Sequence, residues 1–196
     1  DHPPGSGIVW TPRAWVPDNT DGDTSEANAP ATYFDVTLGG SGTITLDDFS
    51  ATIDRLRLTS PGRRLLIGEH GALTTWLSPE ITGGFLTVDG VFTSHRNIWL
   101  LSGIIEGGGR LTIAPTTLFE RSGGDTLYNI AGVISPGTAG TVGTLTVTGN
   151  VQFSSASTFL VTIGASGADL LDVKPYAVAA GGASVPAGGF VDADNA

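Results

Sequence analysis

The sequence predicts an all-β fold, and more narrowly a right-handed parallel β-helix, or β-solenoid, of about six coils with an irregular N-terminal cap. Short segments that alternate Thr with aliphatic residues, such as TITL at 43–46 and LTVT at 145–148, are typical of strands. Turns rich in Gly, or built as Ser-Pro-Gly, separate these segments. No window shows the 3.6-residue periodicity of a helix over a useful length. These observations exclude a helical domain.

A repeated unit distinguishes a solenoid from a sandwich or a barrel. An aliphatic strand, a tight polar corner and a second short apolar strand recur from Leu65, Leu86, Leu111 and Leu145, at intervals of 21, 25 and 34 residues. The first two intervals suit one coil each, and the third leaves room for an extra half-coil or a protruding loop around residues 121–129. Six coils stacked at ~4.8 Å give a rod of about 30 Å, with the usual right-handed winding of parallel connections.

The chain divides into three regions. Residues 1–32 are rich in Pro, Trp and Asp and are expected to form a leader or cap, residues 33–173 the solenoid, and residues 174–196 an Ala- and Gly-rich tail or end cap. A solenoid leaves two open ends that recruit further strands unless they are covered. We expect the leader to cover one end and the tail to be a cap, a linker or an adhesive edge. The residues expected to mediate self-association are Pro175, Tyr176, Val178 and Val185.

Composition excludes several classes of function. The 196 residues include no Cys, which rules out disulfide scaffolds, thiol catalysis and Cys-ligated metals. The net charge is −10, and the nine cationic side chains are scattered, so a nucleic-acid partner is not expected. No apolar run reaches the ~18–20 residues of a membrane span, so membrane insertion of this segment is not expected either. A basic partner or divalent cations suit the charge better.

One part of the chain resembles a known family. The segments GVISPG at 132–137, GTLTVTGN at 143–150, STFLVTI at 157–163 and ADLLDV at 168–173 are similar to the passenger-associated repeat of bacterial autotransporters. Residues 36–119 look like the looser upstream coils of such exported proteins. The resemblance implies a right-handed β-helical passenger that serves adhesion, aggregation or display on a Gram-negative cell surface. It supplies no catalytic residues.

An acidic segment in the leader is a candidate calcium site. Asp18, Asp21 and Asp23 surround Gly22, and Glu26 follows. A hard cation binds several carboxylates around a turn-forming Gly, but the spacing misses the strict calcium-loop pattern. A solvated acidic loop is the alternative explanation.

The candidate catalytic residues carry no complete signature. Asp47, Asp48, Asp54, Arg55 and Glu69 resemble in type the carboxylates and cations of polysaccharide-active β-helices, yet a turn after Leu46 also explains the Asp pair. The sequence contains no G-x-S-x-G elbow, and His70 and His95 are expected at coil corners.

Aromatic and basic side chains leave further alternatives. Trp76, Trp99, Phe85, Phe92 and Tyr128 either line a sugar-binding face or pack in the core and caps. A basic cluster formed by Arg55, Arg57, Arg63 and Arg64 either pairs with the acidic leader of a neighbouring subunit or stays solvated.

These observations together predict a non-enzymatic extracellular module, structural or adhesive, of a bacterial surface or matrix protein. Its expected partners are further copies of the chain, with possible growth into fibres through its termini, or a host or matrix surface. The alternatives are a polysaccharide lyase or hydrolase on the same scaffold and a glycan-binding module.

Overall fold

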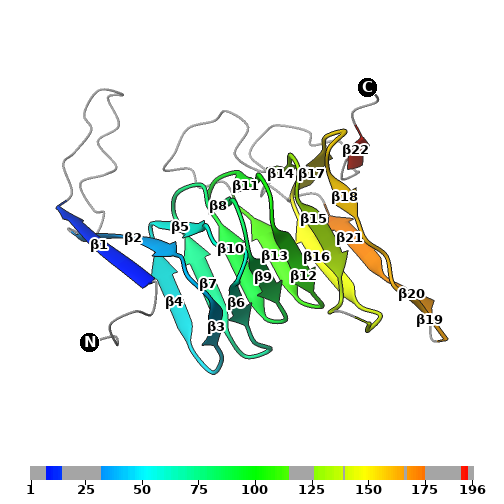
Figure 1. Cartoon of the computed structure of the whole chain (residues 1–196), viewed down its shortest axis with the longest axis horizontal. Coiled ribbons are helices and arrows are strands. Elements are labelled where there is room, and N and C mark those ends of the chain that lie inside the picture. The colour runs from blue at the N-terminus through cyan, green and yellow to red at the C-terminus, as the bar shows by residue number, and fades with distance from the viewer. Residues whose placement is uncertain are drawn as a thin grey trace, which may run out of the picture.

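The fold consists of three long β-sheets wound into a solenoid and a two-stranded sheet of β19 (Ile163–Gly164) and β20 (Gly167–Ala168) (Figure 1). A computed structural model describes residues 8–14, 32–114, 126–138, 140–165, 167–174 and 191–193. Every regular element in these residues is a strand, as the sequence predicts. None of the described residues forms a helix of the length and apolarity that crossing a membrane requires.

Sheet A has eight strands and sheets B and C have six each. Sheet A comprises β1 (Ile8–Ala14), β2 (Thr32–Leu38), β5 (Arg55–Leu58), β8 (Glu80–Ile81), β11 (Ile98–Leu100), β14 (Thr126–Asn129), β17 (Asn150–Phe153) and β22 (Val191–Ala193). Sheet B comprises β3 (Gly42–Leu46), β6 (Arg63–Ile67), β9 (Phe85–Val88), β12 (Ile104–Gly107), β15 (Val133–Pro136) and β18 (Thr158–Phe159). Sheet C comprises β4 (Ser50–Ile53), β7 (Ala72–Thr75), β10 (Val91–Ser94), β13 (Arg110–Ile113), β16 (Thr144–Thr148) and β21 (Leu170–Lys174).

The chain passes through sheets A, B and C in order, six times. The first turn is β2, β3 and β4, and the sixth is β17, β18 and β21. Strands of successive turns pair in parallel, so each turn repeats the one before it along the axis. This arrangement confirms a parallel β-solenoid of about six coils, whereas its right-handed winding stays a prediction.

Side chains at equivalent positions of successive turns form columns. In sheet C one of these columns faces inward. Phe92 and Leu111 are neighbours in it because they pair in the parallel register, and both side chains are completely buried. The members of this column are Ala51, Leu73, Phe92, Leu111, Val147 and Val173. The next position faces outward and is Thr in five consecutive turns, at Thr52, Thr74, Thr93, Thr112 and Thr148. The Thr-aliphatic alternation of the sequence therefore sorts side chains between solvent and core.

The corner between sheets B and C is tight, and glycine is what lets successive turns stack there. A Cβ on Gly90 would come well inside 3.0 Å of the carbonyl oxygens of Gly68 and Gly71 in the turn below. A Cβ on Gly71 would meet the carbonyl of Leu46 in the same way. By contrast, nothing lies within 4 Å of a Cβ on Gly108, at the equivalent corner of the fourth turn.

The structure corrects the phase of the repeat predicted from sequence. Leu86 lies opposite Leu65 in sheet B, as expected, but Leu111 lies opposite Phe92 in sheet C. The sheet B equivalent of Leu86 in the next turn is Ile105. The later two members of the predicted repeat are thus one sheet further along, because sheets B and C share the same Thr-aliphatic texture.

The two predicted end regions each contribute a strand to sheet A. β1, from the expected leader, pairs antiparallel with β2, and β22, from the expected tail, pairs in parallel with β17. Residues 126–129, expected in an extra half-coil or protruding loop, form β14 and occupy a regular place in the sheet. Sheet A is therefore one strand longer than sheets B and C at each end.

Candidate functional site

Polar side chains from two turns meet at the corner between sheets B and C. Asp47 and Asp48 follow β3, and His70 follows β6, the strand that pairs with β3. Asp48 has a left-handed backbone, with a φ of 55°, which turns the chain sharply toward β4. Gly68 lies in the turn above, and its missing side chain leaves room for the Asp47 carboxylate.

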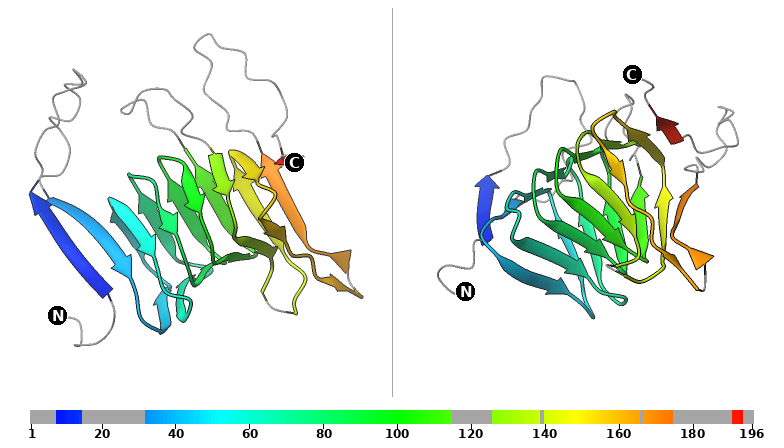
Figure 2. Two further views of the ribbon diagram at one scale, coloured as in Figure 1. Left: turned by 45° about the horizontal axis from the view of Figure 1, so that its top comes forward. Right: turned by 45° about the vertical axis from the view of Figure 1, so that its right-hand side comes forward.

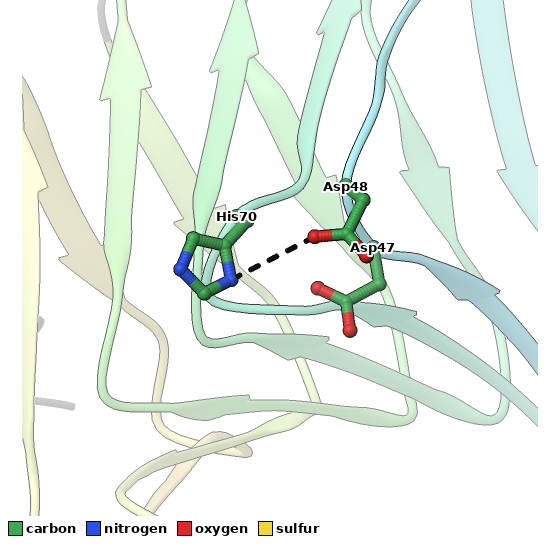
Figure 3. A group of neighbouring side chains, drawn as sticks. All are labelled: Asp47, Asp48 and His70. Carbon is green, nitrogen blue, oxygen red and sulfur yellow. Dashed lines mark ion pairs between the residues drawn. The ribbon is translucent and has the colours of Figure 1, made fainter.

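The side chains of Asp47, Asp48 and His70 form one cluster (Figure 3). One ligand atom from each residue lies within 4.8 Å of the other two, and His70 Nδ1 is 3.9 Å from Asp48 Oδ1. The side chains of His70 and Asp48 are 72% and 87% exposed. Two carboxylates and one imidazole are donors that suit a divalent transition metal better than calcium, which prefers oxygen alone.

The residues expected to form a polysaccharide-active cleft divide between two corners. Asp47, Asp48 and Glu69 lie at the corner between sheets B and C, whereas Asp54 and Arg55 lie at the opposite end of β4, where the chain enters sheet A. The structure therefore does not bring these five residues together on one site.

Asp54 has a structural role at the corner between sheets C and A. Its carboxylate is buried and accepts a hydrogen bond from the backbone N–H of Phe34 in the strand below. Burial raises the pKa of Asp54, the Phe34 hydrogen bond opposes that rise, and the nearby Asp35 adds to it.

The expected basic cluster is likewise distributed over two sheets. Arg55 and Arg57 belong to β5 in sheet A, and Arg57 pairs with Glu80 at 3.4 Å. Arg63 and Arg64 belong to β6 in sheet B, where Arg63 donates to the carbonyl of Gly39 at 2.7 Å. Arg57 thus has an ionic partner and Arg63 a hydrogen-bond acceptor within the chain.

A polar cluster on sheet B has no counterpart in the sequence-based predictions. Arg64 donates to Thr87 and to Glu106, and its guanidinium lies 4.4 Å from the ring centre of Phe85. Glu106 is buried and also accepts a hydrogen bond from Thr87 at 2.9 Å. Thr87 and Glu106 pair in the adjacent strands β9 and β12, so they lie in one column. They are 19 residues apart in the chain, and no local sequence pattern indicates their contact.

The aromatic side chains separate into three environments. Phe92 lies in the core, Trp76 stacks on His95 at 4.3 Å, and Trp99 stacks on Tyr128 at 4.5 Å. Trp99 and Tyr128 lie opposite each other on the outward face of sheet A, and Trp76 lies at the corner between sheets C and A. Through the six turns, the column that contains them is Thr37, Arg57, Glu80, Trp99, Tyr128 and Gln152.

Several predicted site residues lie outside the described part of the chain. The predicted calcium ligands among them are Asp18, Asp21 and Asp23. The predicted self-association residues among them are Pro175, Tyr176, Val178 and Val185. Calcium binding and association through these residues stay predictions.

The sheets, columns and corners define the chain as a β-solenoid protein. When the chain is compared with protein-family models, with curated proteins and with solved structures, nothing matches.

Proposed function

We propose that this protein is a non-enzymatic structural or adhesive module of a bacterial cell surface or matrix, comparable in role to an autotransporter passenger. The observation that carries the proposal is the continuous set of apolar columns through six turns, which makes an elongated body with a fixed direction. Six parallel turns at ~4.8 Å give a core about 25–30 Å long. Such a body suits a spacer or stalk.

The segment that resembles the passenger-associated repeat supports the same role. Residues 132–173 contain β15 to β20 and all but the last residue of β21, and these strands complete the fifth turn and form the sixth. An extracellular location on a Gram-negative-type bacterium is part of the proposal, because passengers of that family act outside the cell.

A surface-display experiment tests this role. The chain is exported on the surface of a Gram-negative host, between a secretion signal and a membrane anchor, and attachment of the cells to matrix-coated plates is measured. A matched display without the chain is the control. We expect the chain to increase attachment or to extend a terminal tag away from the surface, and no change in either quantity would contradict the proposal.

The same protein also tests the enzymatic alternative. We expect no release of reducing ends or unsaturated uronates from a panel of neutral and acidic polysaccharides. Polysaccharide cleavage that Asp47→Asn and Glu69→Gln abolish would make the protein an enzyme instead.

A glycan-binding role is the second candidate, because Trp99, Tyr128 and Gln152 follow one another along the outward face of sheet A. Aromatic rings and amide groups are common in sugar sites, although the Trp99 and Tyr128 rings already cover one face of each other. Calorimetric titration with oligosaccharides tests this role. Binding that Trp99→Ala removes and Trp76→Ala leaves intact would establish it, since Trp76 lies away from this face, at the corner between sheets C and A.

A further inference from the structure

We propose that the chain docks head to tail onto a second copy of itself, with the sixth turn of one copy facing the first turn of the next. This inference deepens the proposed structural function and rests on it. It concerns described surfaces at the two ends of the solenoid, which are separate from the predicted association residues in the tail.

The N-terminal end has an open apolar pocket. Its volume is about 70 Å³, and it is lined by aliphatic side chains of the first turns, which are Val36, Leu38, Ile44, Leu46, Ala51, Ile53, Leu56, Leu65 and Leu73. Ala51 is the smallest member of a column that continues with Leu73 and Phe92. Phe49 lies in the first turn, at the corner between β3 and β4, with 52% of its surface exposed.

The C-terminal end exposes apolar side chains to solvent. They lie in and beside the sixth turn, and they are Phe159, Leu160, Val161, Ile163 and Leu170. Ile163 is 82% exposed and belongs to the hairpin of β19 (Ile163–Gly164) and β20 (Gly167–Ala168). This hairpin projects beyond the last turn, at the end of the molecule opposite β1 (Figures 1 and 2).

The hairpin and Phe49 occupy equivalent corners of the solenoid. The hairpin connects β18 of sheet B with β21 of sheet C, and Phe49 lies where β3 of sheet B connects with β4 of sheet C. A second copy moved along the axis therefore places its first-turn corner against the hairpin of the copy before it. Ile163 then approaches Phe49 and the apolar pocket, and each surface removes the other from water.

Sheet A gives the junction its second contact. β22 forms one edge of sheet A and β1 forms the other, and both outer edges have no partner strand among the described residues. Since β22 is parallel to β17 and β1 is antiparallel to β2, β22 of one copy and β1 of the next run antiparallel after a simple shift along the axis. Their pairing extends the sheet by strand addition.

The extra strands of sheet A also explain why the hairpin projects. Two copies that meet through β22 and β1 keep sheets B and C apart by the thickness of two strands, because those sheets end one strand earlier at each end. The hairpin lies on that side and contributes apolar surface to the space. The contact joins two different surfaces and repeats by translation, so it produces open filaments and not closed dimers.

Mass measurements on the full chain test the proposal. We expect the average mass in light scattering to rise continuously with concentration, and negative-stain images to show rods of increasing length. Phe49→Asp blocks the N-terminal surface and Ile163→Asp blocks the C-terminal surface, so each variant alone is expected to weaken association at least tenfold. Ile130→Asp is the matched control, because Ile130 is an exposed aliphatic residue at a corner of the fifth turn.

A mixture of the two blocked variants separates this arrangement from others. A head-to-tail contact leaves one intact junction in the mixture, so we expect dimers of one copy of each variant and nothing longer. A wild-type chain that stays monomeric at millimolar concentration, dimers that do not grow, or equal weakening by Ile130→Asp would overturn the proposal. Circular dichroism establishes that each variant is folded, and Leu170→Asp replaces Ile163→Asp if the latter does not fold.

The display experiment makes the two failures distinguishable. A monomeric chain that still promotes attachment contradicts the docking and leaves the surface role in place. A chain that forms rods but has no effect on attachment or tag extension contradicts the surface role and leaves the docking in place.

Discussion

Asp169 is a single residue that connects the last two turns of the solenoid. Its carboxylate accepts hydrogen bonds from the backbone N–H groups of Thr162, at 2.6 Å, and Gly143, at 2.8 Å. Burial raises the pKa of Asp169, but these hydrogen bonds outweigh burial and hold the pKa below its ordinary value. The ionised carboxylate therefore stabilises the β16–β21 end of the solenoid.

Asp169→Asn is expected to lower the free energy of unfolding at pH 7 by about 1–3 kcal/mol, because an amide cannot accept from both N–H groups. In the wild type this contribution is complete above the unfolded pKa of ~3.9 and is lost as the pH falls through the lower folded pKa. Urea denaturation from pH 7 to pH 3 measures both effects. A variant with wild-type stability and an unchanged pH profile would show that Asp169 is not a stabilising contact.

Asp54 predicts the opposite dependence. Because the folded pKa is raised, the charged form is disfavoured in the fold, and stability from this group increases as the pH falls through the folded pKa toward the unfolded one. Asp54→Asn keeps an acceptor for the Phe34 N–H and removes the charge beside Asp35, so we expect stability at pH 7 to change by less than about 1 kcal/mol.

Asp54→Ala is the control for that substitution. It leaves the N–H of Phe34 without its acceptor and is expected to cost about 1–3 kcal/mol. The same denaturation series measures both variants, and equal losses from Asn and Ala would mean that the charge itself stabilises the corner.

At the scale of elements, the corners between sheets B and C accept fewer residue types than the strands do. Gly90 lies directly above the carbonyl groups of Gly68 and Gly71, whereas Gly108 faces open space at the next turn. We expect Gly90→Ala to lower the free energy of unfolding by about 1–3 kcal/mol, because the added methyl separates two paired turns.

Gly108→Ala is the matched control, and it should change stability by less than about 0.5 kcal/mol or increase it slightly through lower entropy of the unfolded chain. Chemical denaturation of both variants is the measurement. Equal effects at the two positions would show that the turns do not stack as closely at Gly90 as the geometry indicates.

The strands of sheets B and C could be predicted from sequence, because their Thr-aliphatic alternation reflects burial directly. Sheet A could be predicted only in part, since β8 has two residues and β11 has three, too few for a periodic signal. The same shortness concealed the column of Trp99 and Tyr128, which the sequence-based analysis grouped with Trp76. Spacing also failed to place Leu111, because corners of unequal length change the number of residues in a turn.

The candidate site was predictable only in part for a related reason. Asp47 and Asp48 were recognisable as an acidic pair, but their contact with His70 depends on the register between β3 and β6. Likewise, Arg64 and Glu106 come together across two turns, a contact that no local pattern indicates.

At the scale of the whole molecule, burial changes along the axis. Core side chains from Ile81 to Val147 are almost fully buried, while Ile44, Leu46 and Ala51 at one end and Leu171 and Val173 at the other are only partly buried. In a linear stack each turn is stabilised mainly by its neighbours, so the end turns have fewer stabilising contacts.

Amide hydrogen exchange on dilute protein should therefore show a gradient. We expect the slowest exchange in β9, β10, β12 and β13, and faster exchange in β3, β4, β18 and β21. At concentrations that favour head-to-tail docking the end strands should gain protection, and the central strands should not change. Uniform protection along the chain at low concentration would contradict a turn-by-turn distribution of stability.

The columns of the solenoid also bear on how such a chain changes during evolution. Leu65, Leu86, Ile105 and Ile134 are neighbours along the axis although 21, 19 and 29 residues separate them in the chain. Extra residues at a corner thus move no core side chain out of its column. Insertions can accumulate at corners as new surface, and whole turns can be duplicated or deleted, so length and surface diversify independently of the core.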